Sequence, residues 1–210
     1  MDQFITLAQI RTLLLSLPVV FFALSVHEFA HAYVSKRLGD PTAERAGRLT
    51  LLPWAHLDPF GTLMLIISRL SGFGFGWAKP VPINPSYYRN PAQGVFLVSL
   101  AGPAANFVTA VPFGLLMRLP LFSGFPPAVR ELIFSAVLIN LGLFLFNLIP
   151  VPPLDGSGIL AYFLHGRARY RFQMMQRYGF VILLALIMTG LVNRILIHPF
   201  IFLFRLLTGR

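Results

Sequence analysis

Long stretches without a charged residue constrain this chain more than any other feature. Arg89 and Arg118 enclose 28 residues with no Asp, Glu, Lys or Arg, and Glu131 and Asp155 enclose 23. A helix needs about 20 mostly apolar residues to cross the hydrocarbon core of a bilayer. Both stretches are therefore predicted to be membrane-spanning helices, over about residues 90–118 and 129–149.

Composition agrees with a chain that lives in lipid. Of the 210 residues, 56% are apolar and 11% are charged, whereas soluble domains carry roughly 25% charged residues. So few charges cannot cover a water-exposed surface, which excludes a disordered chain and argues against a soluble globule. The net charge of +10 indicates contact with the anionic inner leaflet, and we expect no nucleic acid partner.

Two further helices are predicted at the ends of the chain. An apolar run begins at Thr12, and its helical pattern continues to Leu38, before Gly39-Asp40-Pro41 stops it. The acidic Asp2 and the lack of a small-residue cleavage site argue against a secretory signal. We therefore expect a first helix over about 5–38 and a last one over about 178–204. Asn193, Arg194 and Pro199 mark a kink or exit point in the last helix.

The connection over residues 41–88 has no clear helical pattern. Gly47–Leu52 reads as a short β-like run, residues 59–70 are apolar but too short to cross alone, and residues 72–85 are rich in Gly, Pro and aromatics. Non-helical backbone at membrane depth must be buried in protein or line water. We expect a re-entrant region beside a hydrated cavity, although residues 59–88 are also compatible with a span. The fold class is then an all-α polytopic membrane protein of four to five transmembrane helices, built as one domain over residues 1–210.

Basic residues predict the orientation. Eleven of the 17 Lys and Arg residues lie on one side of the predicted spans: four after the first helix, three in the broken region and four between the last two spans. By the positive-inside rule that side is cytosolic and the amino terminus is outside. The protein is thus expected in the cell membrane as a multi-pass protein. The sequence carries no signal for an oligomeric state.

His27-Glu28-Phe29-Ala30-His31 fits the pattern H-E-x-x-H. On a helix, positions i and i+4 share a face and lie about 6 Å apart, so both imidazoles can reach one zinc ion. Glu28 stands beside the pair, where it can accept a proton from a zinc-bound water whose pKa the metal lowers to about 7. A polar packing cluster is the alternative, but His and Glu are costly inside a bilayer and favour a functional interpretation.

Asp155 is the best candidate for a third zinc ligand. The other acidic residues lie at chain ends or in polar connections, whereas Asp155 follows a long apolar helix that Pro152-Pro153 must break. His31 precedes the basic Lys36 by five residues, about 8 Å of helix. Ligand and histidines are therefore expected to meet just below the cytosolic interface. A plain helix-end carboxylate is the competing interpretation.

Several motifs now resemble the site-2 protease family of intramembrane zinc metalloproteases. They are the H-E-x-x-H, Gly39-Asp40-Pro41-Thr42-Ala43, Gly76-Trp77-Ala78-Lys79-Pro80-Val81-Pro82, Ala101-Gly102-Pro103-x-x-Asn106 and Asn147-x-x-Pro150-x-x-Pro153-Leu154-Asp155-Gly156. The resemblance covers about residues 20–165. We expect a minimal member of the family, without its usual PDZ or CBS domain. It implies Zn²⁺ bound by His27, His31 and Asp155, Glu28 as the base, and Asn147 as a group that holds the substrate or the oxyanion.

The implied reaction is peptide hydrolysis inside the bilayer, on a single-span membrane protein, as in regulated intramembrane proteolysis. A helical substrate must unwind first, so we hypothesise that Gly47–Leu52, with Leu49 and Leu51, pairs with it by strand addition. Asn106 and His56 are weaker substrate-binding candidates. For Asn106 a hydrogen bond from its side-chain amide across helices is the simpler interpretation. The same holds for Asn140, and for His56 the simpler interpretation is a hydrogen bond to Asp58.

Two other functions fit the same residues. A membrane metal-ion transporter would also place His, Glu and Asp inside the bilayer, but no internal repeat with matching ligands is present. An inactive relative that only binds would not need the complete set of ligands and base. Loss of reporter cleavage in Glu28→Gln, with zinc retained, separates the peptidase from both.

Overall fold

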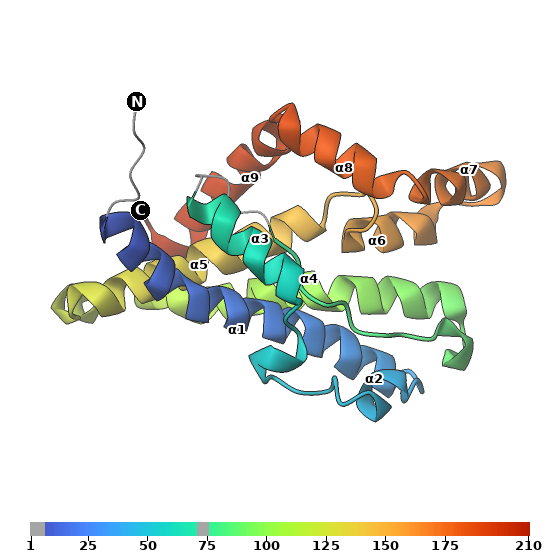
Figure 1. Cartoon of the computed structure of the whole chain (residues 1–210), viewed down its shortest axis with the longest axis horizontal. Coiled ribbons are helices and arrows are strands. Elements are labelled where there is room, and N and C mark those ends of the chain that lie inside the picture. Colours follow the sequence, from blue (N-terminus) through green and yellow to red (C-terminus); the bar gives the residue numbers. More distant parts are fainter. Residues whose placement is uncertain (1–6, 71–75) are drawn as a thin grey trace.

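A computed structural model describes residues 7–70 and 76–210, and these residues form helices joined by loops and short 3₁₀ turns. The α-helices in chain order are α1 (Leu7–Arg37), α2 (Thr42–Arg45), α3 (Pro59–Leu70), α4 (Pro91–Leu116), α5 (Pro127–Asn147), α6 (Asp155–Phe163), α7 (Gly166–Gln176), α8 (Gly179–Met188) and α9 (Leu191–Thr208). The 3₁₀ turns are η1 (Pro53–Ala55), η2 (Pro85–Tyr87) and η3 (Pro120–Gly124). Figure 1 shows α7 and the carboxyl terminus at opposite ends of the molecule.

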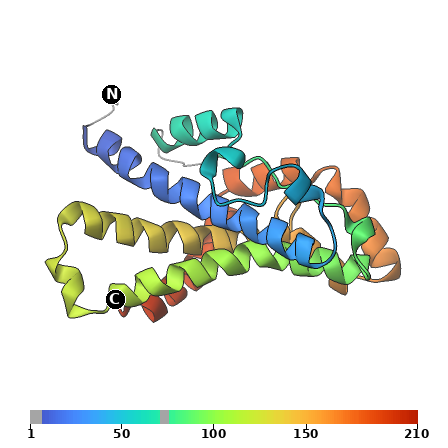
Figure 2. The ribbon, with the colours of Figure 1, turned by 90° about the horizontal axis from the view of Figure 1, so that it is seen from below.

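Within the described residues, four helices are long and apolar enough to cross a bilayer. They are Arg11–Arg37 of α1, then α4, α5 and α9. This confirms the expected fold class, an all-α multi-pass membrane protein. Helices α1, α4 and α5 run beside one another along the long axis, as Figures 1 and 2 both show. The functional candidates of α1 therefore face residues of α4 and α5 inside the bundle.

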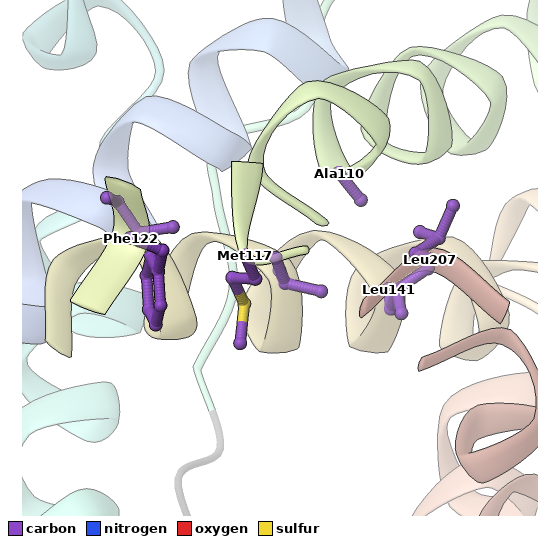
Figure 3. Close-up of a cluster of buried hydrophobic side chains, with 7 residues drawn as sticks. Ala110, Met117, Phe122, Leu141 and Leu207 are labelled. Carbon is purple, nitrogen blue, oxygen red and sulfur yellow. The ribbon is translucent and has the colours of Figure 1, made fainter. Parts of the chain in front are cut away.

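The apolar core joins α4, α5 and α9 at the end of the molecule remote from α7. Ala110 and Met117 of the α4 segment, Phe122 of η3, Leu141 of α5 and Leu207 of α9 pack together there (Figure 3). Fully burying a side chain of this size contributes about 1.5–3 kcal/mol each. The core fixes the far ends of α4 and α5 and so keeps their other ends in register beside α1.

The last predicted span is broken at Gly190, not at the residues that the sequence suggested. Gly190 adopts a φ of 70° and separates α8 from α9. Pro199 lies inside α9, and Asn193 and Arg194 stand in its first turn. A residue with a side chain is strained at such a φ, whereas glycine is not. The ten residues of α8 reach only about 15 Å, which is too short to cross a 30 Å hydrocarbon core alone, whereas α9 is long enough to cross by itself.

The β-like run predicted over Gly47–Leu52 is not a strand. That segment is loop and turn, and Leu49 packs with Ala32, Ala43 and Val81. The extended pairing of this region lies later, where Leu57 and Ala78 form an isolated antiparallel bridge. The Lys79 N–H also donates to the His56 carbonyl over 2.8 Å. Residues 71–75 of the predicted Gly- and Pro-rich stretch lie outside the described residues.

A buried carboxylate closes the turn after α1. Asp40 is fully buried and accepts hydrogen bonds from the Ser35 hydroxyl (2.8 Å), the Thr42 N–H (2.9 Å) and the Asn84 N–H (2.7 Å). Burial alone would raise the pKa of Asp40, but a hydrogen bond from the Thr42 hydroxyl, together with those three, outweighs it and holds that pKa below its ordinary value. Asp40 thereby ties the end of α1 to the segment that leads into α4.

Candidate active site

Three potential ligands from two distant parts of the chain converge beside α4. His27 and His31 lie one turn apart on the same face of α1, with their Nε2 atoms 3.1 Å apart. Oδ2 of Asp155 lies 3.1 Å from Nε2 of His27 and 3.3 Å from Nε2 of His31. Both histidines are buried. The structure thus brings together the two imidazoles and the carboxylate that the sequence singled out, as a group able to hold a metal ion.

The break between α5 and α6 carries Asp155 to this place. Helix α5 ends at Asn147, and α6 starts at Asp155. The residues between them include Pro150, Pro152 and Pro153, which cannot continue a helix. Asp155 consequently occupies the first turn of a new helix instead of the end of the old one.

The hydrogen bonds at Nδ1 of each imidazole ring indicate that the two Nε2 atoms can bind a cation. Nδ1 of His31 lies 2.7 Å from the Val98 carbonyl, and Nδ1 of His27 lies 2.6 Å from Oδ1 of Asn106. When each Nδ1 donates its proton to that oxygen, each Nε2 turns a lone pair to the centre. Oδ2 of Asp155 is buried and accepts no hydrogen bond among the described residues. Three such acceptors repel one another unless a cation lies between them.

The spacing of the three atoms is compatible with zinc. Zinc binds imidazole nitrogen and carboxylate oxygen at about 2.0–2.2 Å in tetrahedral sites, which separates neighbouring ligand atoms by about 3.3 Å. The observed separations are 3.1 to 3.3 Å. Three protein ligands also leave a fourth position, as catalytic zinc sites do. The residues present therefore fit the metal that the sequence predicted.

Gly102 of α4 allows the helix to approach the imidazoles. A Cβ atom at this position would lie 2.4 Å from Nε2 of His31 and 2.7 Å from Cε1 of His27, closer than any real contact. Only glycine leaves room there. The sequence places Gly102 in a family motif but indicates no role for it, because the residues around position 102 do not show which helix Gly102 faces.

Glu28 faces the same cavity and is held by backbone. Its Oε2 accepts the Val81 N–H over 2.9 Å, and the side chain is largely buried. Glu28 is therefore oriented in the cavity through one of its two carboxylate oxygens. The sequence placed Val81 in a family motif but indicated no contact with Glu28, which lies 53 residues away.

A cavity of about 520 Å³ surrounds these groups. Asn147 lines it from the end of α5, and its amide donates one hydrogen bond to the Leu143 carbonyl over 3.0 Å. The other walls come from the connection before α4, from α5 and from α8, and include Gly76, Trp77, Ala78, Pro80, Val81, Ile83, Phe146, Phe180 and Leu183. An apolar chamber with a few convergent polar groups is typical of a binding or active site.

The weaker substrate-binding candidates lie elsewhere. Leu49 and Leu51 do not line this cavity. His56 is buried, and its Nε2 contacts the Thr50 carbonyl at 2.8 Å rather than Asp58. The interpretation of His56 as a partner of Asp58 is wrong, because Asp58 instead accepts the Gly61 N–H at the start of α3. Asn106 is fully buried behind His27 and forms hydrogen bonds between helices through its side-chain amide. It therefore does not contact the cavity as a substrate-binding residue would.

A second cavity of about 790 Å³ adjoins the first. Leu24, Leu143 and Phe146 belong to the lining of both, as do Gly76 and Trp77. Its other walls come from α1, α3, α5 and the bend between α8 and α9. The candidate ligands therefore open into an apolar space that continues between the helices.

Comparison with known proteins places the chain in a family. The model of peptidase family M50 matches residues 126–189. A protein of Bacillus subtilis (strain 168), "Putative zinc metalloprotease YwhC", is 38% identical over 204 residues, which cover 93% of this chain and 90% of that protein. The chain belongs to peptidase family M50.

Other relatives of this M50 peptidase are longer than it. "Putative zinc metalloprotease Rip2" of Mycolicibacterium smegmatis is 33% identical over 181 residues, which are 82% of this chain and 66% of that protein. The protein of the same name in Mycobacterium tuberculosis (strain H37Rv) is 28% identical over 171 residues, 81% of this chain and 65% of that protein. No solved structure matches the chain at a significant level.

Proposed function

We propose that this M50 peptidase is a zinc metallopeptidase that hydrolyses peptide bonds within or near transmembrane segments. The observation that carries the proposal is the meeting of His27, His31 and Asp155 in one cavity with Glu28, inside a bundle of membrane-spanning helices. The names of the relatives describe zinc metalloproteases, which agrees with the chemistry of these ligands. None of these comparisons supports the alternative of a metal-ion transporter.

In this proposal His27, His31 and Asp155 hold the zinc ion. Bound there, zinc supplies a Lewis acid and lowers the pKa of water to about 7. Glu28 accepts the proton of the attacking water at Oε1, while its Oε2 stays on the Val81 N–H. The same oxygen then returns that proton to the nitrogen of the leaving amine. Glu28 thus ends the reaction in the charge state in which it began.

Asn147 is the proposed donor to the developing oxyanion. One of its amide hydrogens is used by the Leu143 carbonyl, and an amide has two. The second hydrogen is available to a substrate carbonyl in the cavity that Asn147 lines. Removing one such donor in hydrolases costs about 10²–10³ in rate.

We place the substrate backbone along residues 76–83 instead of along Gly47–Leu52. Several residues of this segment line the cavity that holds Glu28. Pro80 and Pro82 have no N–H, and the Val81 N–H is taken by Glu28. The segment therefore offers carbonyl groups, apart from that of Lys79, which accepts from Arg48, and an unwound substrate can donate its own N–H groups to them.

The adjoining apolar cavity of about 790 Å³ suits a few residues beside the cleaved bond of a single-span membrane protein substrate, as in regulated intramembrane proteolysis. We also keep the orientation inferred from charge. Helix α7 and its flank carry Arg167, Arg169, Arg171 and Arg177 and no acidic residue. By the positive-inside rule this end faces the cytosol, and α6, which begins at Asp155, leads directly into it.

Cleavage of a reporter transmembrane segment by the purified chain in proteoliposomes tests the function. Glu28→Gln should abolish cleavage and keep one zinc per chain, because the ligands are untouched. Glu44→Gln is a matched control. Glu44 lies on the short α2 helix and forms an exposed ion pair with Lys36 of α1, so this variant should cleave normally. Cleavage by Glu28→Gln would refute the peptidase mechanism, and zinc flux without cleavage would favour the transporter.

A further inference from the structure

We propose that Asn106 is a positioning residue that fixes the His27 ring for metal binding, and that Asn140 in turn holds Asn106. The proposal rests on the metal site proposed above. Its geometric basis is a chain of hydrogen bonds that crosses three helices. Oδ1 of Asn106 lies 2.6 Å from Nδ1 of His27, and Nδ2 of Asn106 donates to Oδ1 of Asn140 over 3.0 Å. Asn140 closes the chain by donating to the Ala136 carbonyl over 2.9 Å.

The acceptors around Asn106 determine which way its amide points. Nδ2 of Asn106 also lies 3.0 Å from the Ala23 carbonyl. A backbone carbonyl can only accept, so the NH₂ end of Asn106 must face Ala23. The oxygen end must then face His27. An amide oxygen can only accept as well, so Nδ1 of His27 is the donor and carries the ring proton.

This protonation has a direct consequence for the metal site. A neutral imidazole carries one ring proton, so Nε2 of His27 keeps its lone pair and presents it to Asp155 and His31. If the proton moved to Nε2, that nitrogen could not bind a metal. Asn106 therefore selects the one tautomer of His27 that can act as a ligand.

The two histidines are held in different ways. Nδ1 of His31 is bonded to a backbone carbonyl, that of Val98, which any residue at position 98 provides. The tautomer of His27 depends instead on a side chain. Asn106 and Asn140 are almost completely buried, so bulk water cannot replace the Asn106 oxygen as the acceptor for His27 when Asn106 is substituted. Substitution at position 106 should thus release one ligand of the pair and leave the other in place.

Four variants of the full-length chain test this proposal. Asn106→Leu removes the acceptor, Asn106→Asp keeps an oxygen acceptor, and Asn140→Leu removes only the outer link. Thr109→Val is the matched control, because Thr109 also lies on α4 and its hydroxyl bonds only the Ala105 carbonyl of its own helix. Zinc dissociation constants come from chelator competition in detergent. The ring tautomers come from ¹⁵N NMR of histidine-labelled protein at pH 8, where five histidines give few signals.

Loss of an outer-shell partner typically weakens metal binding 10- to 100-fold, and we expect this for Asn106→Leu, with His27 shifted from the Nδ1–H form. Asn140→Leu should weaken zinc binding only a few-fold, and Thr109→Val should bind like wild type. Asn106→Asp keeps the acceptor for His27 but turns an oxygen toward the Ala23 carbonyl, so it should keep the Nδ1–H form of His27 and bind zinc more tightly than Asn106→Leu. Wild-type affinity and an unchanged His27 tautomer in Asn106→Leu would overturn the proposal.

A folding defect is separated by melting the zinc-free proteins. If Asn106→Leu fails to fold, the His27 tautomer in folded Asn106→Asp decides: the Nδ1–H form supports the proposal, and the Nε2–H form overturns it. Failure of the proposed function looks different. A wild-type chain that binds no zinc would refute the metal site, whereas the His27 tautomer in the zinc-free protein still reports on Asn106.

Discussion

Replacing Gly102 with alanine should empty the metal site without unfolding the protein. The added Cβ would lie 2.4 Å from Nε2 of His31, 2.6 Å from its Cε1 and 2.7 Å from Cε1 of His27. The closest of these is 1 Å short of an ordinary contact of 3.4 Å. Metal–ligand distances tolerate only about ±0.2 Å, so a ring that moves by this much no longer reaches the ion.

The size of the effect follows from that displacement. Zinc affinity should fall at least about 100-fold, equivalent to about 2.7 kcal/mol. The zinc-free protein should lose less stability than this, because the overlap costs about 1–3 kcal/mol and the preference of a helix for alanine over glycine offsets up to about 1 kcal/mol of it. Chelator competition and thermal melting with and without EDTA measure the two quantities separately.

Gly142→Ala is the matched control for zinc binding. Gly142 also lies inside a spanning helix, and a Cβ there would meet nothing within 4 Å. Its zinc affinity should equal that of wild type. If Gly102→Ala binds zinc as tightly as Gly142→Ala, the packing of α4 against the two imidazoles is not as described.

Three further outcomes are expected. Asp40→Asn should destabilise the fold by about 1–3 kcal/mol at pH 7. Because folding lowers the pKa of Asp40, the stability that its carboxylate contributes is present above the unfolded-state pKa of about 3.9 and is lost as the pH falls through the folded-state pKa. A difference in melting temperature between the two proteins that is as large at pH 3 as at pH 7 would contradict this. Val81→Pro removes the N–H that orients Glu28 and should slow reporter cleavage about tenfold with zinc content unchanged, whereas an unchanged rate would mean that Glu28 needs no such support. Arg118→Gln removes donors to the Leu206 and Leu207 carbonyls at the end of α9 and should speed amide hydrogen exchange in the last turn of that helix, while Arg130→Gln should not.

The parts of the site that one helix or one break determines were predictable from sequence. His27 and His31 share a face because their spacing matches the helical period. Asp155 begins a new helix because prolines end the previous one. Three of the spans, in α1, α4 and α5, were likewise expected, because length and the absence of charge decide whether a segment can cross a bilayer; the last was expected over about 178–204 and is instead α9, Leu191–Thr208.

Contacts between helices were not predictable in the same way. Asn106 lies behind His27, and Val81 holds Glu28, because of how α1 and α4 are rotated and how the chain before α4 folds back. No local pattern records such rotations. The β-like run at Gly47–Leu52 misled for a related reason: alternation of apolar residues also suits a loop whose Leu49 packs inward, and a strand needs a partner.

Zinc content and X-ray absorption of the purified chain test the central claim most directly. The structure predicts one zinc per wild-type chain, bound by two imidazoles and a carboxylate, and a large loss of zinc in His27→Ala, His31→Ala and Asp155→Ala. Stoichiometric zinc with an unchanged absorption spectrum in Asp155→Ala would contradict the claim that these three residues form one metal site.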